Sequence, residues 1–241
     1  MIKKILIDRK DNKIYWEKSD LHTMFGVIKE EDIIKGKEKV YSNWDKEFLI
    51  FDANFKDNLE KIKRGAATTH LKDIGIILAY TGIGKDSIVL EAGSGSGQLC
   101  IMLANFVKKV YSYEIKKDFY DIVKKNIEKL EIKNVDLKLK DVYEDVEEKK
   151  ESFFDLIVLD LNEPWRFLKN INILKSGSYL VCYLPTIKQV DKLVEEAKSF
   201  NLYFEKCTEI LEREWFVEDL KVRPKNEMLG HTAFLVFFRK F

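Results

Sequence analysis

The sequence predicts an α/β protein whose main domain is a doubly wound, seven-stranded sheet ending in an antiparallel hairpin, preceded by a small β-rich domain. Two observations carry this prediction. From residue 87 onward, short apolar runs alternate with longer helix-like runs, which is the pattern of a parallel sheet covered by helices. Before that point, short apolar segments recur at intervals of about ten residues. We therefore predict two domains, 1–58 and 59–241.

The first domain contains five candidate strands separated by turn-prone pairs such as Asp-Asn, Lys-Gly and Ser-Asn. They are Ile2–Ile7, Lys13–Trp16, Gly26–Ile28, Lys39–Tyr41 and Phe48–Phe51. Regular short strands of this kind favour a small barrel-like β-module. The charged stretch 29–37 is interpreted as a connection between two of the strands. Residues 56–86 form a bridge, with a Lys-rich helix or loop at 58–64 and a helix ending near Thr81-Gly82.

In the second domain the predicted strands are 87–91, 109–114, 135–140, 154–160 and 177–184. The predicted helices are 98–107, 116–130, 164–174 and 186–200. The last part of the chain departs from this alternation, because 203–217 and 231–240 have the pattern of two long strands joined by a loop. We expect them to form an antiparallel hairpin at the edge of the sheet.

Composition narrows the class of protein. Charged residues make up 34% of the chain but nearly cancel, at a net charge of +1, so any nucleic-acid site must come from local patches or from several subunits together. The 3 cysteines show no CxxC or Cys/His cluster and are expected to be reduced thiols. No signal peptide is visible, and no run approaches the roughly 18 apolar residues of a membrane span. We expect a soluble, cytoplasmic protein that binds neither a membrane nor a metal ion.

A candidate ligand site begins at residues 87–97, where a short apolar strand gives way to Gly93, Gly95 and Gly97 and then to a helix. Glycine permits positive φ and close approach of a ligand to the backbone. The helix N-terminus adds free N–H groups and partial positive charge. The spacing differs from the dinucleotide pattern G-x-G-x-x-G, because Gln98 stands at the last glycine position. By itself this turn would suit any nucleotide-like ligand.

Acidic residues end the following strands, at the sheet edge where such folds bind ligands. Glu114 could accept both hydroxyls of a ribose, Asp141 could read an adenine edge, and Asp160 ends the fourth strand. Together with Glu91, these acids suit S-adenosylmethionine, which carries an ammonium and a sulfonium and has no pyrophosphate. The alternatives are a surface acid at Glu114, a turn residue at Asp141 and a structural cap at Asp160.

Five stretches resemble one known family, the tRNA (adenine-N1)-methyltransferases of the TrmI type, with an archaeal-like pattern. Asp160-Leu-Asn-Glu-Pro-Trp165 is the most specific of them. The others are Val89–Gly97, Tyr183–Val190, Arg213–Val217 with Arg223-Pro224, and Gly230–Leu235. The resemblance covers about residues 60–241. It implies a Rossmann-like class I methyltransferase sheet, S-adenosylmethionine as cofactor, and a homotetramer. It also implies a tRNA substrate methylated at N1 of adenine 58 in the T loop, with the preceding adenine as a second target.

The resemblance also assigns residues. It implies cofactor binding by the glycine turn and the strand-end acids, namely Gly93, Ser94, Gly95, Ser96, Gly97, Glu114, Phe119, Asp141 and Asp160. It implies catalytic roles for Asp160 and for His70, in a loop over a flipped base. Adenine N1 already carries a lone pair, so the transfer needs alignment rather than a strong base. Asp160 could accept a hydrogen bond from the N6 amino group and stabilise the charge that develops on the ring.

Several alternatives remain open at this stage. Enzymes that methylate exocyclic amino groups usually carry Asp/Asn-Pro-Pro-aromatic here, whereas Leu161 and Asn162 intervene in this chain, which favours a ring nitrogen. Trp165 could be a core residue, and His231 a structural or subunit contact. Other substrates, such as a protein carboxyl group or a precorrin, and a non-catalytic RNA-binding subunit are the rival functions. Candidate phosphate contacts are Lys61, Lys63, Arg64, Arg213, Lys221, Arg223 and Lys225.

Overall fold

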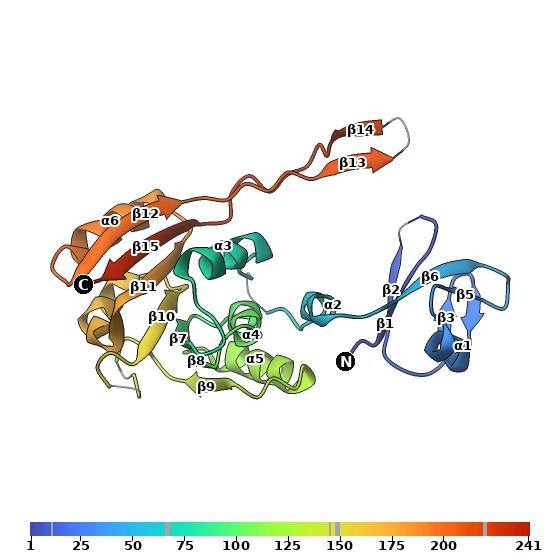
Figure 1. Ribbon diagram of the computed structural model, residues 1–241, viewed down its shortest axis with the longest axis horizontal. Helices are drawn as coiled ribbons and strands as arrows, with labels where there is room; N and C mark the ends of the chain where they lie inside the picture. Colours follow the sequence, from blue (N-terminus) through green and yellow to red (C-terminus); the bar gives the residue numbers. More distant parts are fainter. Residues whose placement is uncertain (11, 66–67, 145, 148–149, 219–220) are drawn as a thin grey trace. The chain divides into compact units, whose positions relative to one another are not determined.

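The computed structural model describes residues 1–241 except 11, 66–67, 145, 148–149 and 219–220. The chain forms two compact units, residues 1–62 and residues 63–241 (Figure 1). We call them the N-terminal unit and the C-terminal unit, and each is described by itself. In the parts of the chain that are described, no helix is long and apolar enough to cross a membrane.

The N-terminal unit is built on an antiparallel sheet of order β2-β1-β6-β5. Its strands are β1 (Lys4–Ile7), β2 (Lys13–Trp16), β5 (Lys39–Tyr41) and β6 (Glu47–Asp52). Side chains alternate along β6, so that Phe48 and Ile50 are buried while Leu49 and Phe51 are exposed. The buried side chains form one core with Leu6, Trp16, Ile28, Ile33 and Val40. A separate two-stranded ribbon pairs β3 (Leu21–Thr23) with β4 (Gly26–Ile28).

One expectation for this unit is corrected, and two of its elements were not predicted. The sheet is open, with β2 and β5 at its two ends, rather than barrel-like. The charged stretch 29–37 contains helix α1 (Glu30–Lys35), because one apolar residue, Ile33, is fully buried against the sheet and the acids occupy the first turn. Strand β3 was not expected, since three residues of mixed polarity carry little pattern. The predicted helix or loop at 58–64 corresponds to α2 (Phe55–Glu60), which Asn54 and Asp57 begin with a capping box.

The C-terminal unit contains the predicted seven-stranded sheet, in the order β12-β15-β11-β10-β7-β8-β9. Five strands are parallel: β7 (Ile88–Ala92), β8 (Lys109–Glu114), β9 (Val135–Leu139), β10 (Phe154–Leu159) and β11 (Leu174–Leu184). At the other edge, β15 (Phe234–Lys240) runs antiparallel to both β11 and β12 (Leu202–Thr208). This confirms the predicted fold class, including the antiparallel C-terminal strands.

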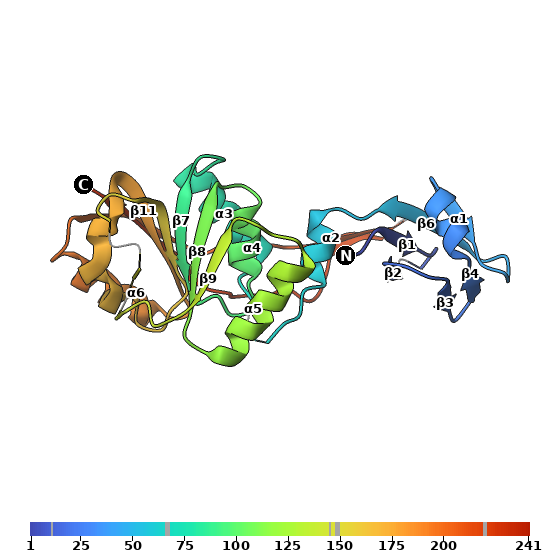
Figure 2. The same cartoon turned by 90° about the horizontal axis from the view of Figure 1, so that it is seen from below.

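Helices cover both faces of this sheet (Figure 2). One face carries α3 (Leu71–Thr81), α4 (Gln98–Ala104) and α5 (Lys117–Lys129), and the other carries α6 (Ile187–Ala197) and η1 (Pro164–Ile173). The predicted helix at 164–174 is a 3₁₀ helix with Pro164 in its first turn. Trp165 packs partly buried against the core, and Cys100 and Cys182 are buried free thiols.

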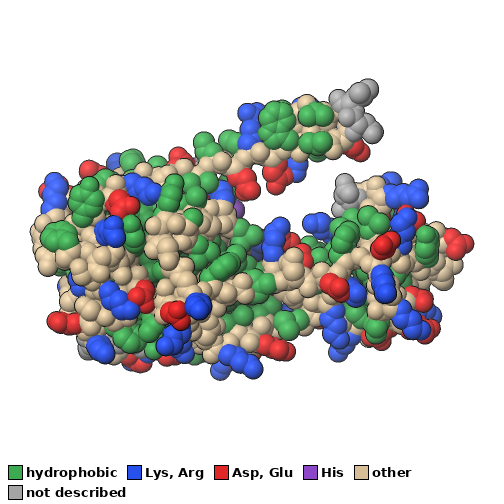
Figure 3. Space-filling model, in the orientation of Figure 1, with side chains coloured by type: hydrophobic (Ala, Val, Ile, Leu, Met, Phe, Trp, Pro, Cys, Tyr) green, Lys and Arg blue, Asp and Glu red, His purple; other side chains and the backbone are tan. Residues whose placement is uncertain are grey.

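The predicted strand 203–217 is wrong in its second half. Strand β12 ends at Thr208, where its pairing with β15 ends. The charged residues that follow have no neighbouring strand, and regular structure resumes only in a separate ribbon of β13 (Trp215–Glu218) and β14 (Lys221–Pro224). This ribbon projects from the C-terminal unit (Figure 1) and carries hydrophobic and basic side chains on its surface (Figure 3). The last strand starts at Phe234 rather than at residue 231.

Candidate active site

The glycine turn after β7 needs its glycines. Gly93, Gly95 and Gly97 have φ angles of 92°, 55° and 84°, as the sequence predicted. A Cβ atom on Gly93 would lie 2.0 Å from the carbonyl oxygen of Asp160. Gly97 is the N-cap residue of α4. The backbone of the turn, which carries no side chain at Gly93, therefore lies directly against the end of β10, at the carboxyl edge of the sheet.

The two serines of the turn face the interior instead of the sheet edge. The Ser94 hydroxyl lies 2.6 Å from that of Ser112 and donates to the Tyr113 carbonyl, at 3.1 Å. The Ser96 hydroxyl accepts the Gly65 N–H at 3.0 Å. Both serines are buried. Their side chains fix the shape of the turn, and they are not among the residues that line the three cavities described below.

Glu91, the acid before the glycines, lies beneath the turn and not at the ligand edge that the sequence suggested. It is fully buried, and its Oε2 accepts a hydrogen bond from Ser112 at 2.6 Å. Its Oε1 has no hydrogen-bond partner among the described residues. Burial raises the pKa of Glu91 to about 8. The carboxyl is therefore mostly neutral at pH 7.

A first cavity of about 340 Å³ opens between the ends of β7, β8 and β10. We call it the turn cavity; it is lined by Gly93, Gly95, Glu114, Ile115, Lys116, Phe119, Asp160, Leu161 and Asn162. Glu114 is rigidly held there, since its two carboxylate oxygens accept the N–H groups of Gly95 at 3.0 Å and Lys116 at 2.9 Å. The structure thus brings together five of the predicted cofactor residues.

A smaller cavity of about 80 Å³ adjoins the turn cavity and shares Gly93, Glu114, Ile115 and Leu161 with it. It adds Asp141, Val142 and Tyr143 from the end of β9. Asp141 makes the turn contact that was its alternative role, because its Oδ1 accepts the Tyr143 N–H at 2.8 Å. The same residue lines the cavity, so the two interpretations are compatible.

A further cavity of about 300 Å³ is also lined by Asp160. We call it the second cavity; it is lined by Thr68, His70, Asp160, Tyr183, Pro185, Leu229, His231 and Thr232. Among the residues that the structure describes, Asp160 is the one that lines both this cavity and the turn cavity. Burial, reinforced by the negative charge of Glu114, raises the pKa of Asp160 to about 7. A ligand in each cavity would meet at this carboxyl group.

Sequence reasoning did not assign a site role to most residues of the second cavity. Tyr183 and Pro185 follow the buried core of β11, so the rule that ligands bind at the carboxyl ends of strands could have found them. Thr232 was harder to find, because it precedes β15, an antiparallel strand that starts at this edge: Phe234 pairs with Leu184. His231 donates to the Pro185 carbonyl at 2.9 Å and bonds to Glu209, which gives it the predicted structural contact.

The candidate phosphate contacts separate into groups. Lys221 and Arg223 belong to β14, with Arg213 and Lys225 flanking the ribbon, and Lys225 pairs with Glu214. Lys63 and Arg64 precede α3, and Lys61 belongs to the N-terminal unit. Across the described part of the chain, no group of three or more His, Cys, Asp or Glu side chains could hold a metal ion.

The chain is similar to several known proteins. The family model described as the tRNA methyltransferase complex GCD14 subunit matches residues 67–223. A Methanocaldococcus jannaschii tRNA (adenine(57)-N(1)/adenine(58)-N(1))-methyltransferase TrmI is 32% identical over 98% of this chain and 94% of its own. The Thermus thermophilus tRNA (adenine(58)-N(1))-methyltransferase TrmI is 33% identical over 83% and 80%.

Solved structures show the same fold over nearly the whole chain. A tRNA (m1A58) methyltransferase TrmI from Aquifex aeolicus superposes with a TM-score of 0.84 and 29% identity, covering 99% of this chain and 96% of its own. A SAM-dependent O-methyltransferase from Thermotoga maritima superposes with a TM-score of 0.87, covering 99% and 92%, at 23% identity. The second likeness concerns the fold alone.

Proposed function

Because the chain belongs to the family of the tRNA methyltransferase complex GCD14 subunit and the TrmI enzymes, we propose that it methylates N1 of adenine in the T loop of tRNA. The methyl donor is S-adenosylmethionine. The observation that carries the proposal is the position of Asp160, which lines both the turn cavity and the second cavity. One carboxyl group can then face the donor on one side and the base on the other.

The turn cavity has the chemistry that a cationic cofactor requires. Glu114 and Asp160 both line it, and the charge of Glu114 contributes to the raised pKa of Asp160. A nearby positive charge would relieve that repulsion, whereas a pyrophosphate would increase it. S-adenosylmethionine supplies a methyl group on a positively charged sulfur. Residues proposed to hold it are Gly93, Gly95, Glu114, Phe119 and Asp141, with Ser94, Ser96 and Gly97 shaping the turn.

Asp160 is the proposed catalytic residue. As a carboxylate it accepts a hydrogen bond from the N6 amino group of adenine, which directs N1 toward the turn cavity. The same negative charge stabilises the positive charge that the ring acquires when N1 is methylated. No strong base is needed, because N1 carries a free lone pair. Asp160 must therefore be ionised when the base is bound.

The second cavity is the proposed site of the extruded adenine. His70 is exposed and lines it together with Tyr183 and Pro185, so the base can lie against imidazole, phenol and an apolar ring. Extrusion costs a few kcal/mol, which contacts to phosphates must offset. We propose that the basic residues of the β13–β14 ribbon, with Lys61, Lys63 and Arg64, make those contacts. The target is adenine 58, with adenine 57 as the second position.

We further propose that the chain assembles as a homotetramer in the cytoplasm, where its substrate is found. The support is the projecting β13–β14 ribbon, on which Trp215, Phe216, Val217 and Val222 are exposed. Apolar side chains on an arm of this kind are typical of contacts between subunits. Sedimentation should give a mass of four times 28.4 kDa, and a concentration-independent monomer would contradict the assembly.

The experiment that tests the function is incubation of the purified protein with labelled S-adenosylmethionine and an unmodified tRNA transcript, followed by mapping of the methylated base. Label at adenine 58 is expected, and transcripts with guanine at 57 or 58 separate the two positions. Label in protein or a small molecule, with none in tRNA, would overturn the proposal in favour of another substrate. Calorimetry with S-adenosylmethionine excludes a non-catalytic subunit if heat of binding is observed.

A further inference from the structure

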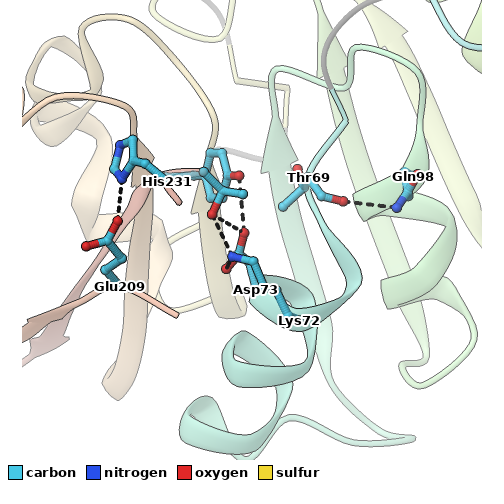
Figure 4. A network of polar contacts seen from close by, with 8 residues as sticks. Thr69, Lys72, Asp73, Gln98, Glu209 and His231 are labelled. Atoms are coloured by element: carbon cyan, nitrogen blue, oxygen red, sulfur yellow. Dashed lines mark hydrogen bonds and ion pairs between the residues drawn. The ribbon is translucent and has the colours of Figure 1, made fainter. Parts of the chain in front are cut away.

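A fully buried carboxylate, Asp73, joins three separate segments that form the second cavity (Figure 4). It lies in the first turn of α3 and pairs with Lys72, whose Nζ is 2.8 Å from Asp73 Oδ1. Thr232, from the segment before β15, donates its hydroxyl to Asp73 Oδ2 at 2.9 Å. Tyr183, from β11, donates to the same oxygen at 3.3 Å.

The hydrogen bonds of this cluster form a consistent set. Lys72 donates to both Asp73 and Thr232, the latter at 2.7 Å, and the single hydrogen of the Thr232 hydroxyl goes to Asp73. Asp73 thus accepts from three donors, and its charge is balanced by Lys72, whose side chain is only 8% exposed. A buried ion pair is weak evidence for stability, because its desolvation cost is large. Stability alone therefore does not account for this pair.

Asp73 is not among the residues that line the second cavity, but it fixes residues that are. His70 precedes α3 as its N-cap residue, and its side chain makes no capping hydrogen bond. The start of α3 is held instead by Asp73 on one side. On the other side, Gln98 of α4 donates to the Thr69 carbonyl at 3.0 Å (Figure 4). The backbone at His70 therefore lies between these two anchors.

Asp73 also engages the hydroxyl of Tyr183. A tyrosine has one O–H hydrogen, and here it is donated to Asp73. Tyr183 and Asp160 line the same cavity. With its hydrogen committed to Asp73, Tyr183 does not compete for the carboxylate oxygens that Asp160 needs for the N6 amino group.

We propose that Asp73 is a positioning residue for methyl transfer: it holds His70 and Tyr183 in place around Asp160 without touching the substrate. This inference rests on the function proposed above. It predicts a selective loss, in which the chemical step slows while the turn cavity, to which Asp73 does not contribute, keeps its cofactor.

The kinetic test uses Asp73→Asn and the double variant Lys72→Met/Asp73→Asn, which removes the lysine left without a counter-charge. Both should lower kcat by about 10-fold or more, while the Kd for S-adenosylmethionine stays within about twofold. The matched control is Asp155→Asn in β10, which also loses a lysine partner: Lys175 lies 2.5 Å from Asp155, and the Ile88 N–H donates to it at 2.8 Å. Its kcat should match that of the wild type.

A double-mutant cycle identifies the path through Tyr183. Tyr183→Phe removes only the hydroxyl, so its effect on kcat and that of Asp73→Asn should be less than additive. The effects of Asp155→Asn and Asp73→Asn should be additive. Wild-type kcat in Asp73→Asn, or an equal loss of kcat in Asp155→Asn, would overturn the proposal.

A spectroscopic test needs no tRNA and so separates this inference from the proposed function. The chain has 3 histidines, which makes their ring signals in NMR spectra simple to assign. Asp73→Asn should move the ring signals of His70 and leave those of His22, in the N-terminal unit, unchanged. An unmoved His70 would contradict the positioning role. If the wild type fails to methylate tRNA, the proposed function fails whatever these spectra show.

Discussion

The backbone of Gly93 runs so close to Asp160 that a Cβ atom at position 93 would lie 2.0 Å from the Asp160 carbonyl oxygen. The adjacent hydrogen bond, from the Asp160 N–H to the Ala92 carbonyl at 2.9 Å, keeps the two chain segments in register. The turn that is proposed to receive the cofactor and the carboxyl that is proposed to orient the base are therefore parts of one rigid arrangement. A displacement of one moves the other.

Gly93→Ala should remove both cofactor binding and activity. The new methyl group meets a backbone atom that cannot rotate away, at a φ of 92° that L-residues rarely adopt. We expect the Kd for S-adenosylmethionine to rise by about 100-fold or more, measured by calorimetry. The control is Gly177→Ala in β11, where φ is 80° but nothing lies within 4 Å of the added methyl. If both variants bound the cofactor equally well, the close approach would have no role.

Asp160→Ala should abolish methyl transfer while retaining most of the affinity for tRNA. Asp160→Asn keeps the shape of the side chain but loses its charge, and we expect kcat to fall by about 100-fold, as for the removal of one electrostatic contact in a closed site. Single-turnover assays and filter binding measure the two quantities separately. Near-normal turnover by either variant would remove Asp160 from the proposed role.

The residues around the end of β10 show which parts of the site the sequence can predict. Asp160 and Glu114 were predicted because an acidic residue at the end of a buried parallel strand lies at the carboxyl edge of the sheet, where ligands bind. Glu91 was misplaced, because strand alternation decides which face a side chain takes, and the pattern Ile-Val-Leu-Glu-Ala is buried on both faces. The second cavity is formed by segments that are far apart in the sequence, around His70, Tyr183 and Thr232. No local sequence pattern predicts that these segments lie together.

The rate should depend on pH through Asp160. Its pKa in the free protein is raised to about 7, so the carboxylate that accepts the N6 amino group is lost as pH falls below that value. We expect kcat/KM for tRNA at low cofactor concentration to rise between about pH 6 and 8 and then level off. At saturating S-adenosylmethionine the midpoint should move to lower pH, because a bound cation favours the ionised form. A midpoint that does not respond to the cofactor would contradict this assignment.

His231 should make the segment before β15 more stable at low pH. Both of its ring nitrogens face acceptors, Glu209 and the Pro185 carbonyl, which requires the protonated ring and raises its pKa. A raised folded-state pKa contributes stability that is complete below the usual value of about 6.5 and is lost as pH rises through the folded-state value. The Tm difference between wild type and Glu209→Gln should therefore be largest near pH 6 and shrink at alkaline pH. A constant difference would mean that the ring is not ionised.

Glu91 offers a test of the buried acid beneath the glycine turn. The pKa of Glu91 is raised to about 8 in the folded protein, so the unfolded chain ionises at a lower pH. The folded protein therefore loses stability as pH rises from the usual pKa range of a glutamate toward that value. Glutamine imitates the neutral acid and does not ionise. Glu91→Gln should match the wild type in Tm at about pH 4 or below, exceed it increasingly up to about pH 8 and by a constant margin above that, with the Kd for S-adenosylmethionine within about threefold.

Glu91→Ala separates packing from charge at the same position. It leaves a space beneath the turn and deprives Ser112 of its acceptor, and we expect its free energy of unfolding to be lower than that of Glu91→Gln by about 2 kcal/mol or more at every pH. Because Ser94 and Ser112 share a hydrogen bond, the turn itself should loosen and cofactor affinity should fall. Denaturant titrations and calorimetry at pH 5, 7 and 9 measure both effects. If glutamine proved as damaging as alanine, Glu91 would act as a charged residue at neutral pH, and the desolvation argument would be wrong.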